Sequence, residues 1–185
     1  MIEIRPLTSI SAGEVHEIGG GYISPARYTV RKVESPERTV ITLELTPLET
    51  PYVKSWERSD TEEEGRYQLF VAEGLSLGAY DEDLLVGLAL TEPRWWNKTL
   101  WIWEFHVAES HRRRGIGLRL MEAVVEKARQ AGFRIVALET QSTNVPAITF
   151  YRTVGFEIDA LDLSLYTNTD IIDGEVALFM KRKIA

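Results

Sequence analysis

The sequence contains no cysteine, and this absence removes several kinds of chemistry at once. Disulfide bonds, metal sites built from thiolates and an acyl-enzyme formed on cysteine are all excluded. Long apolar runs are missing too: the longest extends only over residues 84–90, whereas a membrane-spanning helix needs roughly 20 apolar residues. The N-terminal residues MIEIRPL lack the pattern of a signal peptide. We therefore expect a cytoplasmic protein without a membrane partner.

Positive charge is also scarce. The chain has 21 Lys and Arg residues against 28 Asp and Glu residues, which gives a formal net charge of −7. A general nucleic-acid-binding protein would carry a broad basic face, so we expect no nucleic-acid partner. Three arginines nevertheless stand together at positions 112–114. This local cluster favours one discrete anion pocket, with acidic surface left over to attract a cationic substrate.

The composition is that of an ordinary globular protein, with 44% hydrophobic and 26% charged residues. A length of 185 residues is sufficient for one complete hydrophobic core. The sequence shows no internal repeat, low-complexity tract or linker. We therefore expect a single domain over residues 1–185.

Hydrophobic patterning predicts a mixed α/β fold. Alternating or continuous apolar runs predict strands over residues 2–7, 39–47, 75–80, 84–91, 99–107, 133–138, 156–165 and 176–183. A helical period predicts helices over residues 11–17, 116–131 and 144–154. Residues 22–37 read as irregular, and 67–72 fit either a strand or a helix. The order of elements indicates a mostly antiparallel central sheet, with a parallel βαβ unit (99–107, 116–131, 133–138) at its centre and helices on both faces.

The predicted strand 99–107 leads directly into the arginine cluster. Strict alternation would place Trp101, Trp103 and Phe105 on one face, and Glu104 and His106 on the other.

A glycine-flanked helix start follows the arginines. Gly115 and Gly117 allow a ligand to approach the backbone closely. The start of the helix beyond them offers unpaired N–H groups and a partial positive charge, and the arginines add bidentate phosphate geometry. The predicted ligand is a phosphate, first of all the pyrophosphate of a bulky cofactor.

These residues resemble a known family. Arg112-x-x-Gly115-x-Gly117, after a strand and at the opening of a helix, resembles the acetyl-CoA signature of the GNAT N-acetyltransferases. Asn144, Phe150-Tyr151 and Gly155-Phe156 resemble the family's second conserved block. Together with Asn144 and Phe150-Tyr151, the segments Leu138–Gln141, Leu165-Tyr166 and Glu175–Ala177 resemble streptothricin acetyltransferases in particular. The resemblance implies the acyl-CoA N-acyltransferase fold.

The resemblance also implies acetyl-CoA as co-substrate, with no metal. Backbone N–H groups would cradle its pyrophosphate along Arg112, Arg113, Arg114, Gly115, Ile116, Gly117 and Leu118. In the family the two parallel strands splay apart and pantetheine lies between them, so backbone groups of His106 and Val107 would bind its amides and polarise the thioester carbonyl. Asn144 would bind the pantetheine arm; the alternative is an N-cap for the helix that follows, and the two roles are compatible.

Two side chains are candidates for catalysis. Tyr151 is the candidate general acid, because a phenol with a pKa of about 10 can protonate the leaving thiolate. Glu104 is the candidate general base for the acceptor amine, with Glu139 in reserve. The structural alternatives are a core role for Tyr151 and a substrate-orienting role for Glu104. The lone side chain of His106 is expected to be packed or solvated.

The expected activity is direct transfer of the acetyl group from acetyl-CoA to a primary amine in a ternary complex. The acidic balance and the resemblance favour a small cationic substrate such as a streptothricin-like antibiotic. A protein or peptide amine, or a non-catalytic acyl-CoA-binding module, are alternatives. A dinucleotide oxidoreductase fits less well, because Leu120 stands where its fingerprint needs a third glycine. We expect a monomer or a homodimer.

Overall fold

A computed structural model describes residues 1–56 and 61–184. For residues 61–64 it describes the backbone only. The chain divides into two compact units. The first comprises Met1–Gly20, Ser55–Leu138 and Lys181–Ala185, and the second comprises Gly21–Lys54 and Glu139–Met180. The single domain expected over residues 1–185 stays a prediction. In the described residues no helix is long and apolar enough to cross a membrane.

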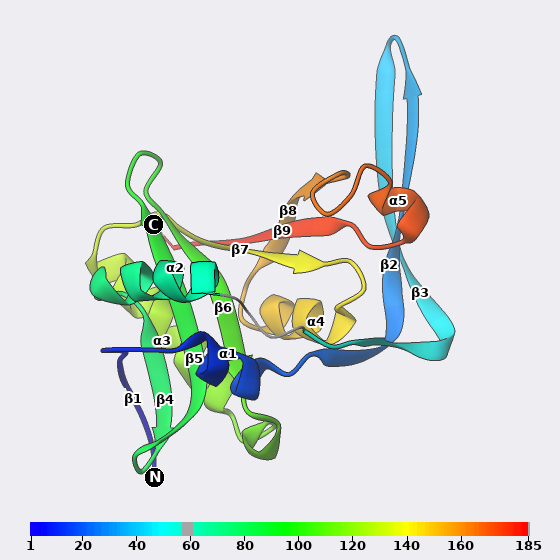
Figure 1. Cartoon of the computed structure of the whole chain (residues 1–185). Coiled ribbons are helices and arrows are strands. Elements are labelled where there is room, and N and C mark those ends of the chain that lie inside the picture. Colours follow the sequence, from blue (N-terminus) through cyan, green and yellow to red (C-terminus); the bar gives the residue numbers. More distant parts are fainter. Residues whose placement is uncertain (57–60, 185) are drawn as a thin grey trace. The chain divides into compact units, whose positions relative to one another are not determined.

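The first unit is built on a mixed sheet with the strand order β1-β4-β5-β6-β7 (Figure 1). Its strands are β1 (Ile2–Pro6), β4 (Leu77–Asp81), β5 (Leu84–Arg94), β6 (Thr99–Val107) and the first part of β7 (Ile135–Gln141). Neighbours from β1 to β6 pair antiparallel, whereas β6 and β7 pair parallel through residues 99–102 and 135–138. Helix α3 (Ile116–Gln130) joins β6 to β7, so the predicted parallel βαβ unit is confirmed.

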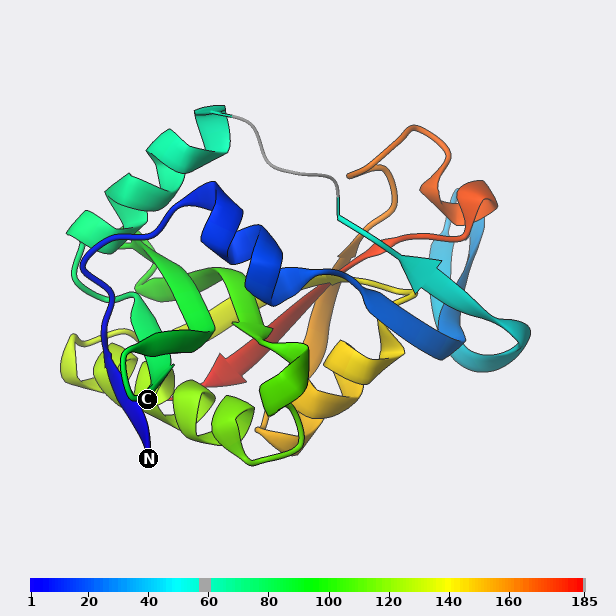
Figure 2. The ribbon, with the colours of Figure 1, turned by 60° about the horizontal axis from the view of Figure 1, so that its bottom comes forward.

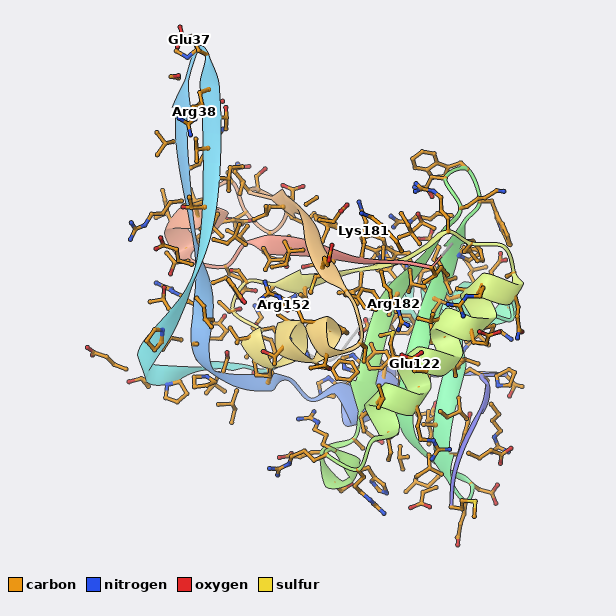
Figure 3. All side chains as sticks on the ribbon, turned by 180° about the vertical axis from the view of Figure 1, so that it is seen from behind. Glu37, Arg38, Glu122, Arg152, Lys181 and Arg182 are labelled. Carbon is orange, nitrogen blue, oxygen red and sulfur yellow. The ribbon has the colours of Figure 1, made fainter. Side chains whose placement is uncertain are left out.

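Helices cover both faces of this sheet (Figures 1 and 2). Helices α1 (Ala12–Gly19) and α2 (Thr61–Ala72) pack on Leu88 and Leu90 of β5. Helix α3 covers the other face, where Ile116 packs with Ala79 and Val86. An ion pair of 2.9 Å between Arg182 and Glu122 lies on the outside of α3 (Figure 3). The predicted arrangement of helices on both faces is confirmed.

Strand β6 contains a β-bulge at Trp103. The register steps from Thr91 opposite Ile102 to Leu90 opposite Glu104, so Trp103 is an additional residue. Two residues in a bulge oppose one on the partner, which interrupts the alternation of side chains. The rings of Trp103 and Phe70 on α2 stack at 5.7 Å, and Glu104 also contacts α2. The expectation that Trp103 and Glu104 lie on opposite faces is therefore wrong.

The second unit contains a long antiparallel hairpin formed by β2 (Tyr22–Ser35) and β3 (Arg38–Lys54). Figure 3 shows its tip at Glu37 and Arg38. The expectation of an irregular segment over residues 22–37 is wrong. Both prolines occupy positions that a hairpin tolerates: Pro25 lies at a register shift, and Pro36 lies in the turn between Ser35 and Arg38.

The rest of the second unit combines two helices with strand segments. Its elements are α4 (Val145–Thr153), β8 (Glu157–Asp162), α5 (Asp170–Asp173), the end of β7 and most of β9 (Ala177–Lys183). The strand order here is β7-β9-β8. Helix α4 packs on β2, and the amide of Tyr28 donates to the carbonyl of Ser142 at 2.8 Å. The helix predicted over residues 144–154 is confirmed, whereas the short α5 was not predicted.

Candidate functional site

The predicted anion-binding loop follows β6 in the first unit. A single 3₁₀ turn (Glu109–His111) leads to Arg112, whose Nε donates to the carbonyl of Val107 at 2.9 Å. Arg113 has a φ of 60° and Gly115 a φ of 77°, so both lie in the left-handed region. A non-glycine residue seldom adopts this conformation. The loop therefore makes two sharp backbone reversals immediately before α3.

Helix α3 begins with its N–H groups uncapped by side chains. Gly115 is the N-cap and has no side chain, and in the described chain the first turn carries neither a capping hydrogen bond nor an acidic residue. Ile116, which is 2% exposed, fixes the first turn against the sheet. The arginines at 112–114 are exposed. An uncapped helix start beside three cations is suited to bind a phosphate group.

The backbone of His106 and Val107 lies at the end of β6 beside β5. The register places His106 opposite Leu88 and Val107 opposite Gly87. A Cβ atom at position 87 would lie 3.1 Å from the carbonyl oxygen of His106, so the close strand approach favours a glycine. Val107 also accepts the hydrogen bond from Arg112. The predicted thioester-binding backbone and the predicted phosphate loop are thus joined directly.

The side chain of Glu104 is held by two partners. The hydroxyl of Tyr67 on α2 donates to Oε1 at 2.9 Å, and Nε2 of His106 lies 2.7 Å from Oε2. Glu104 and His106 keep 27% and 21% of their side chains exposed, whereas Tyr67 is buried. Sequence reasoning missed Tyr67, because no pattern in the sequence connects it with β6.

Helix α4 carries two of the predicted residues in the second unit. Asn144 is its N-cap, and its Oδ1 accepts from the amide of Ala147 at 3.3 Å. The capping role foreseen for Asn144 is therefore confirmed. Tyr151 is 8% exposed, and its ring lies 5.9 Å from that of Phe156.

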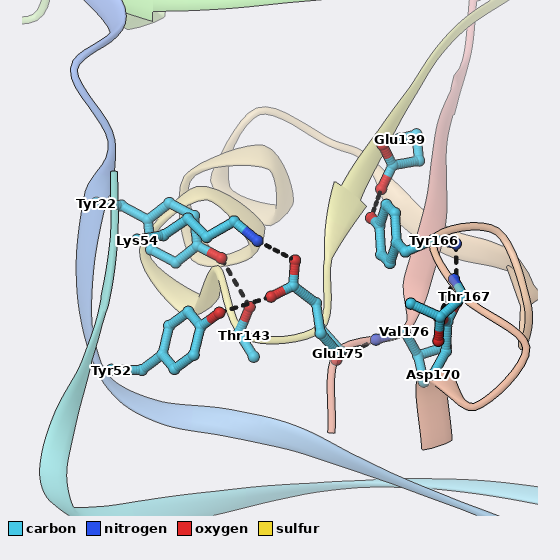
Figure 4. A network of polar contacts seen from close by, with 11 residues as sticks. Tyr22, Tyr52, Lys54, Glu139, Thr143, Tyr166, Thr167, Asp170, Glu175 and Val176 are labelled. Atoms are coloured by element: carbon cyan, nitrogen blue, oxygen red, sulfur yellow. Dashed lines mark hydrogen bonds and ion pairs between the residues drawn. The ribbon is translucent and has the colours of Figure 1, made fainter. Parts of the chain in front are cut away.

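The second unit also contains a polar network that was not predicted (Figure 4). The hydroxyls of Tyr22 and Thr143 are 2.7 Å apart. Glu175 accepts from the Tyr52 hydroxyl at 2.7 Å and from Lys54 Nζ at 2.8 Å.

Glu139, the reserve base, belongs to the same region. Its carboxylate accepts a hydrogen bond from the Tyr166 hydroxyl (Figure 4). Burial, followed by the charge of Glu139, raises the pKa of Tyr166. Burial also raises the pKa of Tyr22, and burial together with Glu175 raises that of Tyr52 to about 12. The phenols of this network are therefore neutral at neutral pH, and those of Tyr52 and Tyr166 donate to carboxylates.

Asp170 organises the loop that carries Tyr166. Its carboxylate accepts from the amides of Tyr166 and Thr167 at 3.1 and 2.7 Å, and from the Thr167 hydroxyl at 2.9 Å. Burial acts to raise the pKa of Asp170, but these hydrogen bonds outweigh it and lower the pKa below its ordinary value.

The structure thus places some of the predicted site residues in contact with one another within the first unit, and others on one helix of the second unit. In the first unit Glu104 contacts His106, and Val107 is bonded to the loop that opens α3. In the second unit Asn144 and Tyr151 share α4. Among the described residues no group of three or more His, Asp or Glu side chains could hold a metal ion.

A mostly antiparallel sheet, with a parallel βαβ unit whose helix opens on an arginine- and glycine-containing loop, defines the acyl-CoA N-acyltransferase class. The model of the acetyltransferase (GNAT) family matches residues 42–156. The chain belongs to this family. The resemblance first drawn from the loop at residues 112–117 is therefore confirmed.

Within the family, the chain is similar to two curated streptothricin acetyltransferases. The streptothricin acetyltransferase of Streptomyces lavendulae is 41% identical over 96 residues, which cover 52% of this chain and 50% of that enzyme. The chain thus spans about half the length of this relative. Streptothricin acetyltransferase A of Bacillus subtilis (strain 168) is 31% identical over 134 residues, 70% of this chain and 72% of that enzyme.

Solved structures are similar over nearly the whole chain. Nourseothricin acetyltransferase aligns with a TM-score of 0.75 and 28% identity, covering 100% of this chain and 99% of that chain. A putative streptothricin acetyltransferase of Bacillus anthracis str. Ames, in complex with acetyl coenzyme A, aligns with a TM-score of 0.74 and 24% identity over 99% of both chains. The predicted fold class is confirmed.

Proposed function

We propose that this chain is an N-acetyltransferase that moves the acetyl group of acetyl-CoA to a primary amine of a small cationic molecule, such as a streptothricin-like antibiotic. The uncapped start of α3, beside Arg112–Arg114, is the observation that carries the proposal. The net charge of −7 favours a cationic acceptor, and the similarity to two streptothricin acetyltransferases supports the same substrate class.

The cofactor-binding residues follow from this proposal. Main-chain N–H groups of residues 112–118 bind the pyrophosphate of acetyl-CoA, and the arginines add positive charge. Backbone groups of His106 and Val107 bind pantetheine and polarise the thioester carbonyl. The side chain of Asn144 binds the pantetheine arm in addition to capping α4. Acetyl-CoA supplies the activated acetyl group, and no metal takes part.

The reaction is a direct transfer in a ternary complex. Glu104 draws a proton from the acceptor ammonium, and the amine nitrogen then attacks the thioester carbonyl carbon. A C–N bond forms, the C–S bond breaks, and Tyr151 gives its phenolic proton to the leaving thiolate. The nitrogen then loses its surplus proton to the Tyr151 phenolate, which leaves a neutral amide and restores the phenol. Removing the ammonium proton matters, because an amine with a pKa of about 10 is only about one part in a thousand neutral at pH 7.

The sequence supports further parts of the proposal. Residues 1–185 form one acetyltransferase domain. The protein works in the cytoplasm, as a monomer or a homodimer. It binds neither nucleic acid nor membranes, consistent with its acidic charge balance.

Mass spectrometry of a substrate panel tests the proposed function. The protein is incubated with acetyl-CoA and, separately, with a streptothricin, other amino antibiotics, polyamines and lysine peptides. We expect one added acetyl group on the streptothricin, and no product when CoA replaces acetyl-CoA. Preferred acetylation of the peptides would contradict the substrate class, and acetyl-CoA binding without any product would contradict the activity.

A further inference from the structure

Glu104 is the middle member of a hydrogen-bonded chain of three side chains. Tyr67 from α2 donates to its Oε1, and its Oε2 meets Nε2 of His106. Both carboxylate oxygens are therefore engaged in the first unit without any substrate. A carboxylate oriented in this way is better suited to support a neighbouring group than to approach an amine itself.

The imidazole of His106 is closed on one edge. A Cβ atom built on Gly19 would lie 3.3–3.4 Å from Cε1, Nε2 and Cδ2 of the ring, so α1 packs directly against the edge that contains Nε2. Nδ1 lies on the other side of the ring, and within the described residues no hydrogen bond engages it. With Nε2–H donating to Glu104, Nδ1 presents a lone pair.

We propose that Nδ1 of His106 is the atom that takes the proton from the acceptor amine, with Glu104 orienting the imidazole and Tyr67 orienting Glu104. This inference rests on the proposed function and replaces Glu104 with His106 as the group that takes the proton. His106 is then the catalytic base, while Glu104 and Tyr67 are positioning residues.

The chemistry favours the imidazole over the carboxylate. A histidine ordinarily has a pKa of about 6.5 and a glutamate one of about 4.3, so imidazole is roughly a hundredfold stronger as a base. The acceptor ammonium gives one proton to Nδ1 and becomes a neutral amine. The resulting imidazolium keeps its Nε2–H bond to the ionised Glu104, so the positive charge lost by the amine reappears beside a negative carboxylate.

Among the side chains that the structure describes, few other charges lie on the elements packed around the pair. Helix α2 presents the neutral phenol of Tyr67, and its Arg66 lies 5.5 Å above the ring of Trp103. Strand β5 contributes Glu92, which accepts from Trp103 Nε1 at 3.0 Å, and α1 contributes the backbone of Gly19. Within the described part of the chain, Glu104 is the carboxylate that contacts His106.

Three variants of the full-length protein test the assignment, with the streptothricin acceptor and acetyl-CoA. His106→Gln is expected to lower kcat by about 100-fold or more and to remove the acid limb of the pH–rate profile. Glu104→Gln should keep that limb while lowering kcat, because the imidazole loses the carboxylate that orients it. Tyr67→Phe should lower kcat by about 10-fold. His16→Gln is the matched control. It replaces a histidine on α1 that has no part in the proposed chain of side chains, and it should leave the pH–rate profile unchanged.

Chemical rescue separates catalysis from packing. Added imidazole should restore part of the activity of His106→Ala, whereas a merely structural histidine would give no rescue. Calorimetric titration of each variant with CoA shows whether it is folded, and we expect unchanged Kd values. Retention of the acid limb in His106→Gln, with its loss in Glu104→Gln, would overturn the inference and leave the proposed function intact.

A wild-type protein that acetylates no amine would overturn the proposed function itself, and the inference with it. Gly19→Ala offers a final test that changes no polar group. The added methyl group presses on the imidazole from α1, while an alanine suits the helix at least as well as a glycine. We expect kcat to fall with the melting temperature preserved, and unchanged kcat would contradict the role of this packing.

Discussion

Nε of Arg112 donates a hydrogen bond of 2.9 Å to the carbonyl oxygen of Val107, and this contact ties the loop before α3 to the end of β6. The arginine that stands first in the cluster is thus partly a structural residue. Arg114 is exposed like Arg112, but within the described residues no such hydrogen bond ties its side chain to β6. The two side chains should therefore respond differently to truncation.

Arg114→Ala should raise the KM for acetyl-CoA by roughly 3- to 10-fold with little change in kcat, because an exposed guanidinium contributes modest, uniform binding energy. Arg112→Ala should raise the KM and also lower the melting temperature, since the carbonyl of Val107 loses its partner. Steady-state kinetics and thermal unfolding distinguish the two variants. An unchanged KM in Arg114→Ala would remove that arginine from the phosphate site.

Gly115→Ala should weaken acetyl-CoA binding more than it weakens folding. Alanine in the left-handed region costs about 1 kcal/mol, which lowers the melting temperature by roughly 2–4 °C. Gly132, with a φ of 80° just beyond the other end of α3, is a matched control. In both glycines an added Cβ meets no atom within 4 Å, so the strain is similar. Calorimetric titration should show weakened CoA binding for Gly115→Ala alone, and equal losses would contradict a backbone phosphate site.

Tyr151→Phe should lower kcat by about 10-fold or more and leave the Kd for acetyl-CoA nearly unchanged. The phenylalanine preserves the packing against Phe156, so the loss would come from the missing hydroxyl. Tyr28→Phe, on the hairpin beside Arg152, is a suitable control. Full activity of Tyr151→Phe in single-turnover measurements would refute the role as general acid.

Asp170→Asn should destabilise the protein at neutral pH but much less in acid. The folded state lowers the pKa of Asp170, so the carboxylate stabilises the protein above its ordinary pKa of about 4, and this contribution is lost as the pH falls through the folded pKa. Urea unfolding at several pH values should show the difference between wild type and variant shrinking below about pH 4. Asp173→Asn, which removes an acceptor of two threonine hydroxyls, is the control. A difference independent of pH would contradict the role of the charge.

The sequence predicts the parts of the fold that depend on local patterns. Strand β6 has the predicted bounds, and α1 lies where a helix was predicted over residues 11–17. The loop at residues 112–117 could be assigned because glycine and arginine spacing bears directly on backbone conformation and charge. Pro25 and Pro36 misled the interpretation, because their tolerance at a bulge and a turn depends on the partner strand.

The parts that sequence could not predict depend on tertiary contacts. The bulge at Trp103 changes which side chains share a face of β6, and alternation alone cannot locate it. The Tyr67–Glu104 bond joins α2 to a strand far along the chain. For the same reason His106 read as a lone histidine, although its ring lies between Glu104 and Gly19.

The most direct test of the whole account is a crystal structure of the protein soaked in acetyl-CoA. We predict that pyrophosphate oxygens accept hydrogen bonds from main-chain N–H groups at the start of α3, beside Gly115 and Gly117. The thioester should lie at the end of β6, beside His106 and Val107. A cofactor bound elsewhere, or none bound at saturating concentration, would contradict the account.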